Sequence, residues 1–280
     1  ETEIAPVIVG GGIHVRNADE SVVIDLGSSS IIDGLQTGVT VSGSNNVMIS
    51  NAGFIGTLGD GVLTEGIVSD QNSEIVVMLA ETSEINAQTL GVSVFGSDLV
   101  SILNAGVIAA DFDPEDPTVS SAVEVLNSDV VNIELSETSH LSSLQNVVDI
   151  RGGKNVTFEN AGYIGAGQSG TSFFGVLVSE ISNDTVINLS SSSEIEAFVS
   201  GLSAEASNNV SIVNAGSIQG VGEGRVLSSI NVLDTQTVSI DLTETSALTA
   251  RFSGISVGSS SDVSISNAGL IDVLSEAGPL

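Results

Sequence analysis

Carboxylates crowd together in one segment of the chain, residues 109–121, which reads AADFDPEDPTVSS. Asp111, Asp113, Glu115 and Asp116 lie within six residues, and carboxylate oxygens are ligands that Ca²⁺ prefers. The run lacks the central glycine and the distal glutamate of an EF-hand loop. Two interpretations follow: a bound Ca²⁺, or an acidic loop in contact with solvent, which is the commoner state of such runs.

An asparagine recurs at one place in a motif, N-A-G followed by one residue and an isoleucine, with copies 53, 56, 54 and 53 residues apart. A catalytic site needs one special place, whereas this residue returns in every repeat, so we interpret it as a structural corner. The side chain can bond the backbone of its turn and tolerate a left-handed conformation, and the glycine two residues on offers a second left-handed position. The copies are Asn51, Asn104, Asn160, Asn214 and Asn267.

Four aromatic residues lie in or beside the longer connecting segments: Phe112, Tyr163, Phe173 and Phe174. An aromatic ring offers a flat apolar face that can stack on a sugar ring. The other interpretation is that each ring packs against the body of the protein and anchors its segment. Both interpretations stay open, and these four residues are the candidate ligand contacts.

The residue types needed for nucleophilic or metal-assisted catalysis do not come together in the sequence. The chain has no cysteine, and His14 and His140 are far apart in the repeat and belong to no serine–carboxylate triad. Neither a phosphate-binding loop nor a zinc spacing is present. Arg151 and Lys154 form a local cationic pair that we interpret as turn residues. We therefore expect no enzyme and no cofactor, apart from the Ca²⁺ considered above.

An internal repeat defines the elements that must position these residues. Each unit of about 53 residues divides into two similar halves, whose first apolar anchors are 25 residues apart in all five units. Such a constant offset means that every residue between the anchors has an assigned place. The anchor pairs are Val22 and Val47, Ile75 and Val100, Val131 and Val156, Thr185 and Val210, and Val238 and Val263.

The half-units have the pattern of short strands. In VVIDL, residues 22–26, Ile24 and Leu26 alternate with Val23 and Asp25, which predicts a strand with one buried face. Every half-unit holds about three such strands, so we predict an all-β, single-stranded parallel β-helix (β-solenoid) of about ten coils in five two-coil repeats. A five-bladed propeller is the alternative, although blade signatures such as Trp-Asp are absent.

The expected organisation is a partial coil at residues 1–21 followed by repeats at 22–74, 75–130, 131–184, 185–237 and 238–280, the last of them incomplete. Extra length falls in the second half-units, after the N-A-G corner. The longer segments are 56–65, 109–121, 165–174 and 219–225, and in a solenoid they emerge along one edge. Since few residues follow the last corner, we expect either a fragment of a longer chain or end coils that pair with a neighbour.

Composition limits the partners. Five lysines plus arginines stand against 35 aspartates plus glutamates, a net charge of −30, which argues against nucleic acid and anionic membranes because both need clustered cations. Every apolar run is shorter than the roughly 20 residues that span a bilayer, so we expect no membrane insertion of this segment. Aromatic residues are 3% of the chain and hydrophobic residues 41%, so the core must consist of Val, Ile, Leu and Ala.

Coils of the form V-x-I-x-N-x-G-x-I, as in VSISNAGLI at residues 263–271, resemble those of bacterial autotransporter passengers and filamentous-haemagglutinin-like surface proteins. The likeness runs from about residue 22 to residue 271 and concerns architecture more than activity. It implies an extracellular protein of the bacterial cell surface, with a stalk or adhesin role and no cofactor. The strict two-coil repeat is more regular than in many passengers.

Three hypotheses of function follow. The first is a non-enzymatic extracellular scaffold or adhesin that presents its variable loops to a host-surface or matrix glycan or protein, or to another copy. The second is a carbohydrate-active β-helix enzyme, a polysaccharide lyase or glycoside hydrolase, although the paired aspartates, Gly-His-Gly and Arg-x-Lys of polygalacturonases are absent. The third is a Ca²⁺-stabilised, self-assembling filament or surface-layer protein with end-to-end association.

Overall fold

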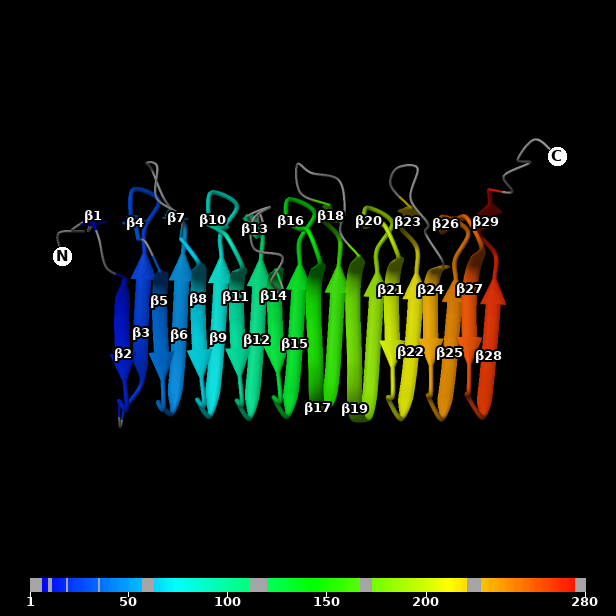
Figure 1. Cartoon of the computed structure of the whole chain (residues 1–280), viewed down its shortest axis with the longest axis horizontal. Helices are drawn as coiled ribbons and strands as arrows, with labels where there is room; N and C mark the ends of the chain where they lie inside the picture. The colour runs from blue at the N-terminus through cyan, green and yellow to red at the C-terminus, as the bar shows by residue number, and fades with distance from the viewer. Residues whose placement is uncertain are drawn as a thin grey trace.

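The chain folds into a parallel β-solenoid of about nine turns, close to the ten coils expected. The fold is seen in a computed structural model that describes residues 7–9, 12–18, 20–34, 36–56, 63–110, 120–166, 173–220 and 228–274. Within these residues there are strands and turns but no helix, and all strand pairs are parallel, which excludes the propeller. Figure 1 shows the strands stacked side by side along one long axis.

Each coil contributes one strand to each of three ladders. The first ladder contains β2 Ile13–Arg16, β5 Thr37–Ser42, β8 Glu65–Asp70, β11 Leu90–Phe95, β14 Ser121–Leu126, the beginnings of β17 Asn146–Asn160 and β19 Phe174–Leu189, β21 Ser200–Glu205, β24 Ser228–Leu233 and β27 Ser253–Gly258. The second ladder contains β3 Val22–Leu26, β6 Asn46–Asn51, β9 Glu74–Leu79, β12 Leu99–Asn104, β15 Val130–Leu135, the ends of β17 and β19, β22 Asn209–Asn214, β25 Thr237–Leu242 and β28 Asp262–Asn267.

The third ladder is a separate 11-stranded sheet of shorter strands. It contains β1 Val7–Val9, β4 Ile31–Asp33, β7 Phe54–Gly56, β10 Glu84–Ala87, β13 Val107–Ala110, β16 His140–Ser143, β18 Tyr163–Ala166, β20 Glu194–Ala197, β23 Ser217–Gly220, β26 Ala247–Ala250 and β29 Leu270–Val273.

The strand register confirms the predicted repeat. Val22 pairs with Val47, and Val47 pairs with Ile75 one coil further on. The same column continues without a slip through the other predicted anchors, so the 25-residue offset is one turn of the solenoid. These anchors are Val100, Val131, Val156, Thr185, Val210, Val238 and Val263.

Alternation along the strands separates the core from the surface. In β3, Val22, Ile24 and Leu26 are buried, whereas Val23 and Asp25 point outward, as predicted. The core is a continuous stack of Val, Ile and Leu, joined by Phe158 at a position where neighbouring coils carry isoleucine. Because most positions of an inward column carry aliphatic side chains of similar size, successive coils can stack at the spacing of about 4.8 Å that the backbone requires.

A left-handed corner separates the first ladder from the second in every coil. One residue per coil has a φ between 49° and 69° there, and its amide commonly donates to a carbonyl of the next coil, as Gln71 does to Phe95 O at 2.8 Å. The residue type varies widely, so the sequence did not predict this corner. The column is Asn17, Gly43, Gln71, Gly96, Asn127, Gly152, Glu180, Ala206, Asp234 and Ser259.

Close packing joins the first and third ladders where glycine precedes an inward apolar residue of the first ladder. A Cβ added to Gly91 would lie 2.2 Å from Ile108 Cγ2 and 2.5 Å from the carbonyl oxygen of Ala122. Gly66 meets Ile85 and Gly91 in the same way. Glycine is therefore used here for close approach, with no positive φ.

Candidate functional site

The recurring asparagines lie at the corner between the second and third ladders. These asparagines share one inward column, in which they alternate with leucines such as Leu79. Asn51, Asn104, Asn160 and Asn214 are at most 2% exposed. In each, Oδ1 accepts a hydrogen bond from the amide of the glycine two residues on, at 3.0–3.1 Å. Asn267, exposed in the last coil, makes the same bond at 2.9 Å.

The prediction of a left-handed conformation at this corner was wrong. Neither Asn51 nor Gly53 has a positive φ. Glycine is required instead because a Cβ at Gly53 would lie 2.3 Å from the carbonyl oxygen of Ser30 in the preceding coil. The asparagine therefore satisfies the backbone of a tight turn, and the glycine lets neighbouring coils approach.

Ser/Thr turns of the alternate coils bond to the asparagine corners. Thr82 Oγ1 donates to Ala52 O, and Thr138 Oγ1 donates to Ala105 O, each at 2.8 Å. Asn160 Nδ2 donates to Ser193 Oγ at 2.6 Å. These bonds join consecutive coils, so the two kinds of corner form one hydrogen-bonded column along the rod.

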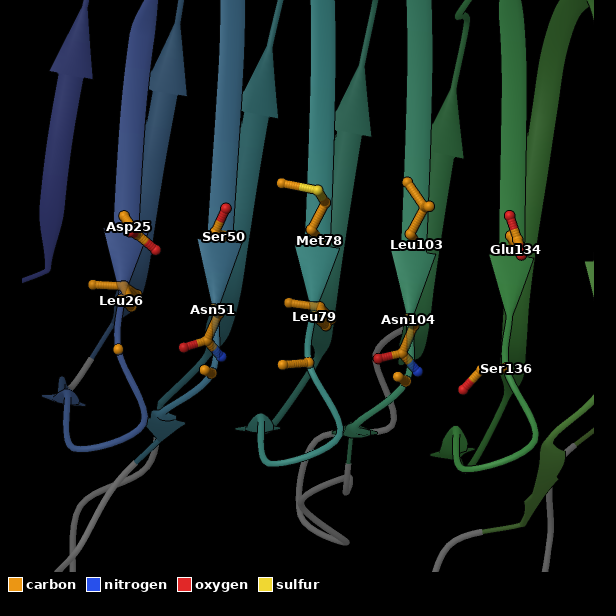
Figure 2. A pocket seen from close by; sticks show the side chains of 14 residues that line it. Asp25, Leu26, Ser50, Asn51, Met78, Leu79, Leu103, Asn104, Glu134 and Ser136 are labelled. Carbon is orange, nitrogen blue, oxygen red and sulfur yellow. The ribbon is translucent and has the colours of Figure 1, made fainter.

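A groove runs along the rod beside this column, with a volume of about 390 Å³. It exists because the corner residues are small, and Figure 2 shows the row of outward side chains on the five neighbouring strands that border it. We call it the corner groove. Its lining consists of Asp25, Leu26, Gly27, Ser50, Asn51, Ala52, Met78, Leu79, Ala80, Leu103, Asn104, Ala105, Glu134 and Ser136.

The corner groove is apolar in the middle and acidic at its ends. Met78 and Leu103 lie on adjacent strands, β9 and β12, and form the central part of the row in Figure 2. Asp25 on β3 and Glu134 on β15 stand at the two ends of that row. The arrangement can hold an apolar ligand that carries positive charge at its ends.

Tyr163, a candidate ligand contact, lies on the outer face of the third ladder. Its ring stacks on His140 with centroids 4.5 Å apart, and its hydroxyl donates to Glu196 Oε2 at 2.7 Å. Burial, followed by the bond to Glu196, raises the pKa of the Tyr163 phenol, and burial lowers the pKa of His140. One face of the tyrosine ring is thus covered by the protein.

The other candidate contacts are divided between described and undescribed parts of the chain. Phe173 is 47% exposed and packs edge-to-face on Phe198, with centroids 6.4 Å apart. Phe174 begins β19 and is half-buried. Phe112 and the four candidate calcium ligands Asp111, Asp113, Glu115 and Asp116 lie outside the described residues.

A charged cluster on the first ladder was missed by the sequence analysis. Arg151 forms two hydrogen bonds with Asp149, each 2.7 Å long, and Asn146 donates to the same carboxylate at 2.7 Å. Glu124, one coil before Asp149 in the same column, accepts from Ser93 at 3.3 Å. Burial, followed by repulsion from Asp149, raises the pKa of Glu124. The 25-residue offset between the two carboxylates was the signal that could have found this pair.

Two further observations concern metals and membranes. Across the residues that the structure describes, His, Asp and Glu side chains form no group of three or more that could hold a metal ion. In the same part of the chain, no helix is long and apolar enough to cross a bilayer.

No family model, curated protein or solved structure matches this chain. What is established is therefore the class of protein that the fold defines, a parallel β-solenoid built from repeated coils.

Proposed function

We propose that this protein is a non-enzymatic extracellular scaffold of the bacterial surface that presents variable loops along one edge for adhesion. The β-solenoid supplies a rigid body, and the resemblance to autotransporter passengers and filamentous-haemagglutinin-like proteins supports the location and the role. A net charge of −30 also favours a partner that is neither nucleic acid nor an anionic membrane.

The observation that carries the proposal is the place where the extra residues are inserted. The chain passes from the third ladder to the first in every coil, and this passage takes two residues between Ala87 and Leu90. In alternate coils the passage is longer, as between Ala110 and Ser121. Because the ends of these strands are in register, the longer passages begin and end on one edge of the rod, about 10 Å apart.

Register also provides a clean way to remove a loop. Ala110 pairs with Ala87, and Ser121 pairs with Leu90, so replacing residues 111–120 by the Gln-Thr of positions 88–89 closes the corner as the preceding coil does. A matched control replaces residues 167–173 by Leu-Gln, because Ala166 pairs with Ser143 and Phe174 with Asn146.

The test is binding of the purified chain to an array of glycans and a panel of matrix proteins. We expect binding that is lost when one of these two loops is replaced and kept when the other is. Binding that survives replacement of both, in variants with unchanged thermal stability, would move the contact away from these two loops. Cleavage of a polysaccharide, measured as new reducing ends in the same samples, would instead favour the enzyme.

Self-assembly is a second candidate, favoured by the regular stacking of the coils. Every strand pair among the described residues is parallel, so the strands of one rod have the geometry to pair with those of a second copy. Sedimentation over a range of protein concentrations, with and without millimolar Ca²⁺, tests this; a constant monomer under both conditions would exclude end-to-end association.

The enzyme alternative has less support among the described residues. Glu124 and Asp149 are adjacent carboxylates, one with a raised pKa, which is a pattern found in glycosidases. Asp149, however, is 1% exposed and is bonded to both Arg151 and Asn146. A carboxylate held in this way acts as a partner in an ion pair rather than as a nucleophile.

A further inference from the structure

Both methionines of the chain lie on one outer face of the rod. Met48 on β6 is 40% exposed and Met78 on β9 is half-buried. Val23, Val76 and Leu103 lie beside them on β3, β9 and β12, with Val23 66% and Leu103 38% exposed. We call these five residues the methionine patch. Methionine is adaptable and polarisable, and proteins use it on surfaces that bind peptides.

The patch is confined to the first coils, although the backbone repeats along the whole rod. Two outward columns of the second ladder cross the patch: one contains Val23, Met48 and Val76, and the other contains Met78 and Leu103. From β15 onward both columns are polar apart from Val186 and Val213. The fold does not require this difference, because the polar coils stack in the same register. These polar residues are Asn132, Thr157, Ser211, Ser239 and Ser264 in one column, and Glu134, Glu159, Asn188, Asp241 and Ser266 in the other.

The surface is hollowed at the patch. The corner groove borders Met78 and Leu103, and a second hollow of about 340 Å³ is lined in part by Val23, Met48 and Val76. The two hollows have no lining residue in common, but Val76 of the second hollow and Met78 of the corner groove lie two residues apart on the outer face of β9, so the methionine patch borders both. The corner groove lies at the corner between the second and third ladders, and the second hollow lies toward the beginnings of β3, β6 and β9. Both are on the second ladder, away from the edge where the longer loops are inserted.

Charge decides between the possible occupants. Asp25, Glu74 and Glu134 flank the apolar centre, and the chain as a whole carries −30. A second copy would bring the same negative charge and be repelled. A glycan would find no aromatic ring in either hollow and a mainly aliphatic centre. We propose that the methionine patch and corner groove bind an extended peptide segment with apolar side chains between two basic residues.

The length of the site defines the peptide. From Asp25 on β3 to Glu134 on β15 there are four strand spacings of about 4.8 Å, or about 19 Å in total. An extended chain rises about 3.3 Å per residue, so basic residues at the first and seventh positions match the two carboxylates. The probe is therefore fluorescein-labelled Lys-Ser-Val-Ser-Leu-Ser-Lys, in which the two lysines and the two apolar side chains share one face of the extended chain.

Fluorescence anisotropy measures its binding to the full chain and to two matched variants. Ala105→Arg places a long cationic side chain in the corner groove. Ala215→Arg makes the same change at the equivalent N-A-G corner outside the groove; the carbonyls of both alanines accept a bond from a threonine. We expect Ala105→Arg to weaken binding by about tenfold or more and Ala215→Arg to leave it within about twofold.

A second pair of variants tests the charges. Asp25→Asn with Glu134→Gln removes the carboxylates at the ends of the groove, and Asp241→Asn with Glu159→Gln removes two from the same column elsewhere. The first pair should weaken the lysine peptide severalfold more than the second. The probe with glutamate in place of lysine should not bind.

Several outcomes would overturn the proposal. These are no binding of the lysine peptide, equal binding of the glutamate peptide, or equal loss in the Ala105→Arg and Ala215→Arg variants, which indicates adsorption by net charge alone. A change of sedimentation coefficient in Ala105→Arg but not in Ala215→Arg would assign the patch to a second copy instead. Circular dichroism melts of both variants establish that each is folded.

Discussion

Asn160 donates a hydrogen bond of 2.6 Å to the hydroxyl of Ser193, which lies 33 residues later and one coil further along the rod. The same amide group also donates to Gly162 O at 3.1 Å, while its oxygen accepts from Gly162 N at 3.0 Å. Three bonds thus converge on a side chain that is 2% exposed. One buried residue closes its own turn and ties it to the next coil.

Replacing Asn160 by leucine should therefore destabilise the protein, although leucine occupies the same column in the neighbouring coils. Leu135 and Leu189 precede the longer Ser/Thr corner, whereas at Asn160 the substitution would leave the buried amide of Gly162 without an acceptor. A buried unpaired amide costs about 1–3 kcal/mol. Urea unfolding measures the change, and Asn267→Leu in the exposed last coil is the control. Equal losses in the two variants would contradict this account.

The glycine that precedes an inward residue of the first ladder in several coils, such as Gly91, is a second point of close contact. Gly91→Ala should cost about 1–3 kcal/mol, because the new methyl group meets both Ile108 and the backbone of Ala122. In the next coil the same column carries Ala122, and Leu141 replaces the isoleucine. We expect Ile108→Leu to restore part of the loss in the Gly91→Ala background. If Gly91→Ala alone is neutral in urea unfolding, close packing does not explain this glycine.

The sequence predicted those parts of the fold in which residue identity repeats with the coil. The anchors from Val22 to Val263 are apolar in nine coils out of ten, with Thr185 as the exception, so their column was predicted and is confirmed. The left-handed corner was not predicted, because Glu180 and Ala206 share a conformation without sharing a chemistry. There the backbone geometry of the coil, rather than the side chain, imposes the positive φ.

The candidate surfaces depend on contacts that periodicity alone does not specify. Asp149 and Arg151 lie two residues apart on β17, and register makes His140 and Tyr163 neighbours, but the ion pair and the ring stacking themselves depend on side-chain conformations. The methionine patch could not be recognised from periodicity either, because the sequence does not show that Met48 and Met78 lie on one outer face until their strands are paired. The predicted calcium ligands lie outside the described residues and stay a prediction.

The left-handed corner offers a stabilising substitution. Ala206 has a φ of 49°, a conformation that costs an L-residue with a Cβ about 1–2 kcal/mol and costs glycine little. Ala206→Gly should raise stability by up to about 1 kcal/mol, after the larger backbone entropy of glycine in the unfolded chain is deducted. Ala215→Gly, at a corner without positive φ, should instead lower stability by about 0.5–1 kcal/mol. Thermal melts of both variants would contradict the account if the two changes had the same sign.

The pair formed by Glu124 and Asp149 makes stability depend on pH. Because burial and the neighbouring Asp149 raise the pKa of Glu124, the folded state holds this proton more tightly than the unfolded chain does. The stabilisation is complete below the unfolded value of about 4.5 and is lost as pH rises through the raised folded pKa. Glu124→Gln keeps the neutral form at every pH, so it should melt higher than the parent at pH 7 and close to it at pH 4. Glu84→Gln, at an exposed position on the third ladder, is the control. A melting difference for Glu124→Gln that is the same at both pH values would show that shape, and not ionisation, sets the stability of this site.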